Sequence, residues 1–175
     1  ELRPDLVVLA AGVTPDVKSF DAFDWETFSA AWNGDLQASF RFLQAAVSAP
    51  LAPGSTVAVV SSGAALNGSP LSGGYAGAKR MQWWLADYAQ RVSDARGLGL
   101  RVVTVVLDQL VAGTTIGGRA AAAYGALAGI TAEAFMARYD APLDADGVAA
   151  AIVAALRGDA HDGARALAVR GSGTR

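Results

Sequence analysis

Three apolar runs without polar alternation predict the strands of a buried sheet. They span Asp5–Gly12 (DLVVLAAG), Ser55–Ser61 (STVAVVS) and Leu100–Leu107 (LRVVTVVL). Short, unbroken apolar runs of this kind are typical of parallel strands that are covered on both faces. A shorter run at Ala164–Val169 predicts one further strand near the end of the chain.

Two long segments between these strands have a helical pattern. The first predicted helix, Trp25–Val47, follows a plausible N-cap at Asp24 and contains a weak position at Gly34. Its apolar residues recur every three or four positions and form one stripe: Phe28, Trp32, Leu36, Phe40 and Leu43. The second predicted helix, Tyr75–Ala95, ends before Gly97.

The chain after the third strand is different in character. Asp108–Leu143 is rich in Gly and Ala, and we expect only short helical pieces in it. A last helix is predicted at Asp146–Leu156, stopping at Gly158. The order β-α-β-α-β-insert-α-β predicts an α/β fold, a doubly wound parallel sheet in a Rossmann-like three-layer sandwich. We interpret 1–175 as one domain in which 107–145 forms a substrate-binding lid.

The first strand has the pattern of an interior strand, although it is the first element. An apolar strand at a sheet edge invites aggregation. No glycine-rich phosphate-binding turn follows a first strand, and Gly113–Gly118 (GTTIGG) lacks the required spacing. We therefore expect that N-terminal β-α units are missing from this chain. A complete smaller domain is the alternative interpretation.

Composition narrows the classes of function. Hydrophobic residues make up 53% and charged residues 17% of the chain, which is typical of a globular domain. The net charge of -2 and the absence of a basic run argue against nucleic-acid binding. With no cysteine and a single histidine, His161, which we expect on the surface, no metal site is expected. No apolar run approaches the roughly 20 residues that span a bilayer, so we expect no membrane partner and a cytoplasmic location.

Ser62, Tyr75 and Lys79 are the residues with the clearest chemical pattern. Ser62 follows a buried strand, and thirteen residues later a helix opens with Tyr-x-x-x-Lys, which places Tyr75 and Lys79 on one helix face. An alkoxide formed by hydride transfer to a carbonyl must be protonated, and a tyrosine can supply that proton. A nearby ammonium lowers the pKa of the phenol from about 10, and a serine hydroxyl can hold the carbonyl oxygen.

This arrangement resembles the short-chain dehydrogenase/reductase family, and the resemblance covers nearly all of the chain. It implies that Ser62 polarises the substrate carbonyl or hydroxyl, that Tyr75 is the general acid/base, and that Lys79 lowers the tyrosine pKa and contacts the nicotinamide ribose. The implied function is an NAD(P)-dependent oxidoreductase that interconverts a ketone or aldehyde and an alcohol. The choice between NAD and NADP depends on residues that the sequence lacks.

Further segments match the family's cofactor-binding positions. Leu9–Gly12 (LAAG) resembles the family's Asn-Asn-Ala-Gly, with both asparagines replaced, and Val111–Thr114 resembles a segment whose threonine contacts the cofactor. The resemblance implies the following cofactor-binding residues: Ala11, Gly12, Tyr75, Lys79, Leu107, Asp108, Leu110 and Thr114.

Two positions depart from the family pattern. Asp35 stands where the family has a catalytic asparagine that holds a water in a proton relay; as the fourth catalytic position it could pair with Lys79. Leu107-Asp108 replaces a Pro-Gly that contacts the nicotinamide. These changes motivate an alternative, a non-catalytic binding or scaffold protein with a degenerate cofactor site. Dehydration or epimerisation on the same fold is a third interpretation.

Several large side chains outside this motif have two interpretations each. Trp83 and Trp84 could form a subunit contact, because the family commonly dimerises through its fourth and fifth helices, or they could pack in the core. We expect a homodimer or homotetramer formed through the two long helices. In the lid, four large side chains could line a substrate pocket or belong to the core: Tyr124, Leu127, Phe135 and Met136.

Overall fold

The computed structural model describes residues 4–157 and 163–174, and its elements follow the predicted alternation. The strands are β1 (Leu6–Leu9), β2 (Thr56–Ser62), β3 (Arg101–Leu107), β4 (Ala166–Arg170) and β5 (Gly173–Thr174). The helices are α1 (Trp25–Ala31), α2 (Gln37–Ser48), α3 (Ala64–Asn67), α4 (Gly73–Arg96), α5 (Thr115–Ala128), α6 (Ala132–Met136) and α7 (Ala145–Arg157). A 3-10 turn, η1 (Phe20–Ala22), precedes α1, and a π turn, η2 (Trp32–Leu36), joins α1 to α2. The predicted stop at Gly158 and the position of His161 lie outside the described residues.

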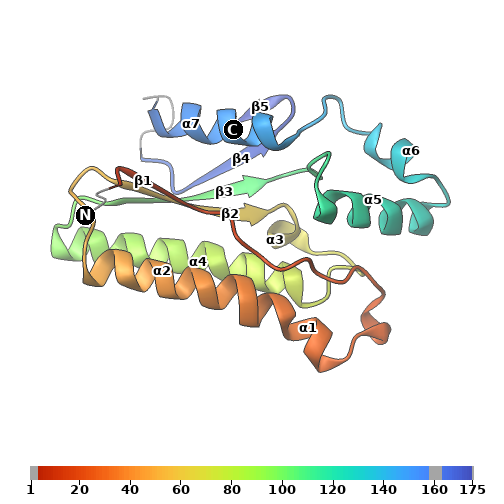
Figure 1. Cartoon of the computed structure of the whole chain (residues 1–175), viewed down its shortest axis with the longest axis horizontal. Helices are drawn as coiled ribbons and strands as arrows, with labels where there is room; N and C mark the ends of the chain where they lie inside the picture. The colour runs from red at the N-terminus through yellow and green to blue at the C-terminus, as the bar shows by residue number, and fades with distance from the viewer. Residues whose placement is uncertain (1–3, 158–162, 175) are drawn as a thin grey trace.

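One sheet in the order β1-β2-β3-β4-β5 forms the middle layer. The first four strands are parallel, and β5 pairs antiparallel with β4. Helices α2 and α4 lie on one face of the sheet and α7 lies on the other (Figure 1). The predicted three-layer α/β sandwich with a parallel sheet is therefore confirmed, whereas the short antiparallel hairpin β4–β5 was not predicted.

The alternation of side chains along β2 divides the core into two clusters. Val57 and Val59 pack toward α2 and α4, where Leu43 and Ala86 are buried. Ala58 faces the other side and belongs to the cluster below α7, whose buried members are Ala58, Val103, Val105, Leu143, Ile152, Leu167 and Val169. Because both faces are covered, the strands lack polar alternation, as the sequence pattern indicated.

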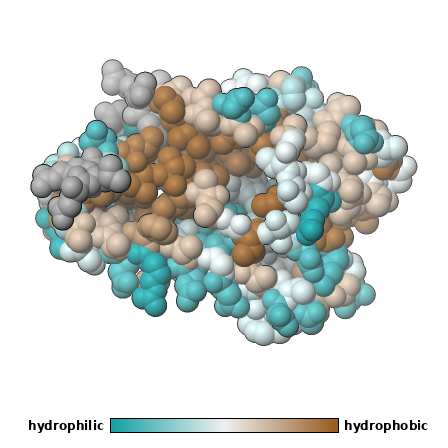
Figure 2. Space-filling model, in the orientation of Figure 1, coloured by the Kyte–Doolittle hydropathy of each residue, from teal (hydrophilic) through white to brown (hydrophobic). Residues whose placement is uncertain are grey.

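Strand β1 lies at the edge of the sheet and is shorter than the predicted Asp5–Gly12. Its Val7 and Leu9 pack against the core, while 38% of Leu6 and 41% of Val8 are exposed. Figure 2 shows hydrophobic residues gathered on this side of the molecule. An exposed apolar edge strand is uncommon, because it offers unpaired backbone groups to other chains. The expectation of further β-α units concerns chain beyond Glu1 and stays a prediction.

The structure corrects three predicted elements. The stretch Asp108–Leu143 was expected to hold short helical pieces at most, but it contains the fourteen-residue helix α5. Thr114 caps this helix by accepting a hydrogen bond from the Gly117 amide, and Gly129 ends it with a φ of 68°. The predicted helix Trp25–Val47 is interrupted by η2, which contains the weak position Gly34. Helix α4 begins at Gly73, ahead of the predicted start.

Among residues 4–157 and 163–174, no helix combines the length and the apolar character that crossing a bilayer requires.

Candidate active site

Ser62, Tyr75 and Lys79 meet at the carboxyl edge of the sheet. Ser62 is the last residue of β2, and its side chain lines the same cavity as Tyr75, close enough to lower the pKa of the phenol. The Lys79 Nζ lies 5.5 Å from the centroid of the Tyr75 ring. The Ser61 hydroxyl donates to the Lys79 carbonyl at 2.9 Å and fixes α4 against β2. The three predicted side chains are therefore held together by neighbouring elements.

A close contact between α1 and the first turn of α4 positions Tyr75. A Cβ atom on Gly74 would lie 2.0 Å from the Phe28 carbonyl oxygen, so only glycine fits where the two helices meet. The indole Nε1 of Trp32 donates to the Gly74 carbonyl at 2.8 Å. These contacts fix the start of α4 and therefore the height of Tyr75 above the sheet edge.

Asp35, the predicted fourth catalytic residue, forms a buried ion pair with Lys79. Its Oδ2 lies 3.0 Å from the Lys79 Nζ, and 1% of Asp35 is exposed. Its Oδ1 accepts a hydrogen bond from the Val13 amide at 2.7 Å. A Cβ atom on Gly12 would lie 2.6 Å from Oδ2, so the glycine leaves the space that the carboxylate occupies. Asp35 thereby ties the segment after β1 to helix α4.

The environment keeps the Tyr75 phenol protonated. Burial raises the pKa of Tyr75 above its ordinary value, the hydrogen bond with Ser62 lowers it, and the charges of Asp35 and Tyr124 raise it further. Because desolvation penalises the phenolate, a neutral phenol is the stable form at neutral pH. The pKa of Tyr75 is thus raised, and not lowered as expected from the neighbouring Lys79, because burial and the Asp35 carboxylate outweigh the ammonium. A phenol that stays protonated is suited to donate a proton.

A cavity of about 300 Å³ opens next to these residues. Its lining includes the predicted residues Ser62, Tyr75, Lys79, Leu107 and Thr114. The cavity wall also contains residues that were not predicted as site residues: Ala10, Val60, Ser61, Gln109, Val111, Ile116, Gly117, Ala145, Val148 and Ile152. The wall is mainly aliphatic, with a few polar groups, which is typical of a small-molecule site.

Four predicted cofactor residues lie outside this lining: Ala11, Gly12, Asp108 and Leu110. Asp108 forms an ion pair with Arg170 at 2.7 Å, and the Leu110 amide donates to the Tyr139 hydroxyl at 3.3 Å. The carboxylate expected to reshape the nicotinamide pocket is therefore neutralised by an arginine of β4. The cofactor-binding role of these four residues stays a prediction.

Gln109 is a site residue that sequence reasoning missed. Its Nε2 donates to the Ala141 carbonyl at 3.0 Å, and its Oε1 accepts from the Gly171 amide at 3.0 Å. It therefore joins the end of the lid region to the β4–β5 turn while lining the cavity. Its place two residues after a buried strand was the available signal. Val148 and Ile152 were also missed, although they are one turn apart on an amphipathic helix.

The large lid side chains divide between different environments. Tyr124 and Phe135 stack with ring centroids 5.7 Å apart, and the Tyr124 hydroxyl hydrogen-bonds Ser69 at 2.5 Å. Leu127 is 65% exposed, so it belongs to neither the core nor this cavity. Met136 lines a separate surface depression next to Gly117.

The tryptophans of α4 are both near the surface. Trp84 is 48% exposed and Trp83 is partly buried, and the Arg80 guanidinium lies over both rings. Trp84 is therefore not a core residue.

No family model matches the chain, and no curated protein sequence matches it. Several solved structures, in contrast, are similar to the chain in fold. A short chain dehydrogenase family protein from Francisella tularensis superposes with a TM-score of 0.74 and 16% identity over 94% of this chain and 68% of that one. An NAD+-bound xylitol dehydrogenase superposes with a TM-score of 0.78 and 14% identity, over 95% and 68% of the two chains. An angucycline C-6 ketoreductase with bound NADP gives 0.69 and 19%, over 93% and 59%.

These likenesses concern the fold, because the identities are low. They cover nearly all of this chain and about two-thirds of the first two structures. The chain therefore has the fold of the short-chain dehydrogenases and reductases over the part of that fold that it spans.

Proposed function

We propose that this chain carries the proton-transfer site of an NAD(P)-dependent oxidoreductase that interconverts a ketone or aldehyde and an alcohol. The observation that carries the proposal is the grouping of Ser62, Tyr75 and the Lys79 ammonium in the wall of one mainly aliphatic cavity. The fold supports it, because the structures of similar fold include a dehydrogenase with NAD+ and a ketoreductase with NADP.

The side chains divide the reduction between them. Ser62 donates a hydrogen bond to the carbonyl oxygen and orients it toward Tyr75. When hydride adds to the carbonyl carbon, the oxygen becomes an alkoxide, and the Tyr75 phenol transfers its proton to that oxygen. Lys79 stabilises the phenolate that remains. In the reverse direction the phenolate takes the proton of the alcohol.

The lining of the cavity fits the reacting end of a nicotinamide cofactor. Ala10 is small and leaves room at the end of β1, Leu107 offers an apolar surface, and Lys79 presents a cation. Thr114 lines the same cavity at the start of α5. When bound, the cofactor supplies or accepts the hydride. Asp108, paired with Arg170, leaves no uncompensated negative charge there.

Isotope transfer to a carbonyl panel tests the reaction class. The full-length protein is incubated with ketones and aldehydes and with NADH or NADPH that carries deuterium at the transferred position. We expect deuterium on the carbinol carbon of the product. Product without the label would indicate dehydration or epimerisation instead. No product with any panel member would favour the non-catalytic alternative, which Asp35 and Leu107-Asp108 motivate.

We also propose that copies of the chain associate through α2 and α4. Aromatic side chains exposed on these helices support this: Phe42, Trp84 and Tyr88 are 60%, 48% and 50% exposed. Large exposed aromatic residues are enriched at subunit interfaces. Light scattering should give a multiple of the mass of one chain, and Trp84→Glu should shift the mass toward that of one chain. A wild-type mass equal to one chain at micromolar concentration would contradict the proposal.

A further inference from the structure

Two groups of Asp35, its side-chain carboxylate and its backbone carbonyl, hold the π turn η2 against α4. The Lys79 ammonium contacts the Asp35 carboxylate, and the Gln82 side-chain amide donates to the Asp35 carbonyl at 3.1 Å. Lys79 and Gln82 lie three positions apart, on one face of α4. Gln82 is 1% exposed, and it also donates to the Ser39 hydroxyl at 2.6 Å. A π turn replaces the usual α-helical bonds with i→i+5 bonds, and here the Gln82 side chain of α4 adds a hydrogen bond to one of its carbonyls.

The contacts of Asp35 suit an aspartate and disfavour an asparagine. Two donors approach its side chain from different elements, the Val13 amide and the Lys79 ammonium, and each meets its own oxygen. A carboxylate offers two acceptor oxygens, whereas an asparagine offers one and would turn an NH2 toward a donor. The aspartate is therefore matched to a direct ion pair, in place of the water relay that the asparagine implies.

We propose that Asp35 is a positioning residue that holds the Lys79 ammonium in a buried ion pair and thereby keeps the Tyr75 phenol protonated. This inference rests on the proposed function of the site and adds to it a preference for proton donation over proton removal.

The charges around Tyr75 support this assignment. Among the described residues, Asp35 from η2 and Tyr124 from α5 raise the pKa of the phenol, and Lys79 from its own helix lies beside the ring. A lone ammonium would stabilise the phenolate strongly. Paired at 3.0 Å with a carboxylate, it acts as one end of a dipole, and its stabilisation of the phenolate is weakened but not abolished. The cost of burying the phenolate then dominates.

Titration of the phenol tests the proposal without cofactor or turnover, so its outcome is independent of the isotope experiment. The chain has four tyrosines. With 13C at Cζ of each, Tyr75→Phe assigns the Tyr75 resonance. In Asp35→Asn we expect the pKa of Tyr75 to fall by about one pH unit or more, because the ammonium is no longer neutralised. Asp35→Glu, which keeps the charge, should restore most of the wild-type value.

Asp94→Asn is the matched control. Asp94 lies on α4, the helix that carries Tyr75, and its carboxylate pairs with the exposed Arg165. It should leave the Tyr75 titration unchanged. A Tyr75 pKa in Asp35→Asn that equals or exceeds the wild-type value would overturn the proposal.

A measurement on the wild-type chain covers the case in which Asp35→Asn does not fold. The chain has two lysines, Lys18 and Lys79. At neutral pH the Lys79 ammonium protons should be visible in a 1H–15N spectrum, because burial with Asp35 slows their exchange, whereas those of Lys18 should be absent. Lys18 is 30% exposed at the side chain and pairs with an exposed Asp16. Equal exchange of the two ammonium groups would contradict a buried pair and overturn the proposal.

Discussion

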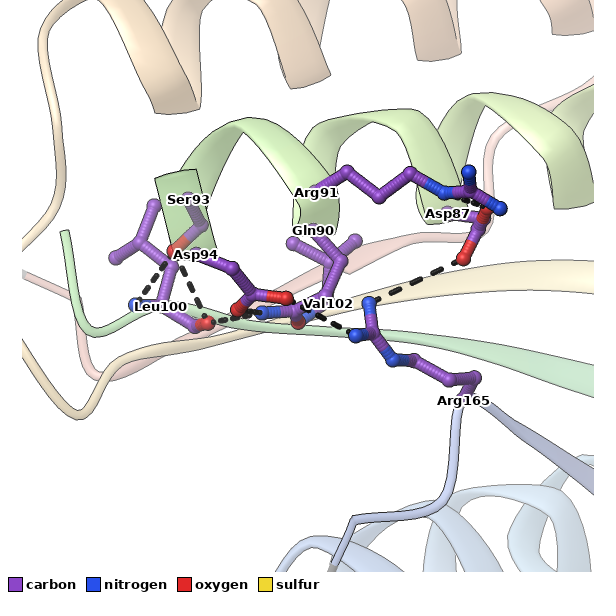
Figure 3. Close-up of polar contacts among 8 residues, drawn as sticks. All are labelled: Asp87, Gln90, Arg91, Ser93, Asp94, Leu100, Val102 and Arg165. Atoms are coloured by element: carbon purple, nitrogen blue, oxygen red, sulfur yellow. Dashed lines mark hydrogen bonds and ion pairs between the residues drawn. The ribbon is translucent and has the colours of Figure 1, made fainter. Parts of the chain in front are cut away.

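The two ends of helix α4 carry ion pairs that differ mainly in their burial. At the first end, Lys79 meets Asp35 at 3.0 Å, and the two side chains are 10% and 1% exposed. At the second end, Arg165 meets Asp94 at the same distance, but these side chains are 47% and 54% exposed (Figure 3). Distance alone therefore does not tell which pair affects stability or chemistry; the amount of water around the pair does.

The second end of α4 is stabilised by a neutral side chain rather than by its charges. Gln90 accepts from the Val102 amide at 2.5 Å and donates to the Leu100 carbonyl at 2.9 Å and to the Asp94 carboxylate at 2.8 Å (Figure 3). Gln90 joins α4 to the amino end of β3, whereas the candidate site lies at the carboxyl ends of the strands. The hydrogen bond from Gln90 also lowers the pKa of Asp94.

The largest effect should follow from removing the cation of the buried pair. Lys79→Met leaves the Asp35 carboxylate buried without its counter-charge, and we expect the free energy of unfolding to fall by about 3 kcal/mol. Urea unfolding at neutral pH measures it. The double variant Lys79→Met/Asp35→Asn should lose less than the single variant. A single variant as stable as the wild type would mean that the pair is hydrated.

Gln90→Ala should be the next most destabilising change. It leaves the buried Val102 amide and the Leu100 carbonyl without this partner, and we expect a loss of about 2 kcal/mol. Because the site lies at the other end of α4, the Tyr75 titration should not move. A shift of that titration would show that the two ends of α4 are coupled.

The raised pKa of Tyr75 predicts a smaller effect that appears only in alkaline solution. In the unfolded chain the phenol titrates near its ordinary value of 10.0, and in the folded chain it titrates higher. Between these values the folded state binds more protons, so the free energy of unfolding falls as the pH rises through that window. Below pH 10.0 this contribution is fully present.

Tyr75→Phe should remove that part of the pH dependence, whereas Tyr88→Phe should not. Urea unfolding at about pH 8 and about pH 11 compares the variants, and we expect a difference on the order of 1 kcal/mol. Parallel pH profiles for the wild type and Tyr75→Phe would contradict the prediction.

The smallest effect should come from the exposed pair. Asp94→Asn should leave the urea midpoint nearly unchanged, because water and salt already screen the charges of Asp94 and Arg165. Raising the salt concentration should reduce any remaining difference. A large loss of stability in Asp94→Asn, comparable to that of Lys79→Met, would remove the distinction between the two ends of α4.

The sequence predicted the features that depend on local pattern. The apolar runs gave the parallel strands, and the spacing of Ser62, Tyr75 and Lys79 placed three side chains at one edge of the sheet. That prediction succeeded because the carboxyl end of a strand and the first turn of the next helix are neighbours in any right-handed crossover.

The features that were missed depend on contacts distant in sequence. Helix α5 has a weak apolar stripe and several glycines, and its cap at Thr114 is a local signal that was not used. The π turn is satisfied by Gln82, 47 residues from Asp35, and Asp108 is neutralised by Arg170, 62 residues away. No local pattern indicates such pairs.

Turnover by two tyrosine variants of α4 shows whether Tyr75 is the proton donor. With the full-length protein, a reducible ketone and the preferred nicotinamide cofactor, Tyr75→Phe should lower kcat/KM by about 100-fold or more, since it removes the proton donor. Tyr88→Phe, which alters a half-exposed ring between three and four turns further along the helix, should leave kcat/KM unchanged. Equal activity of Tyr75→Phe and the wild type would show that Tyr75 is not the proton donor.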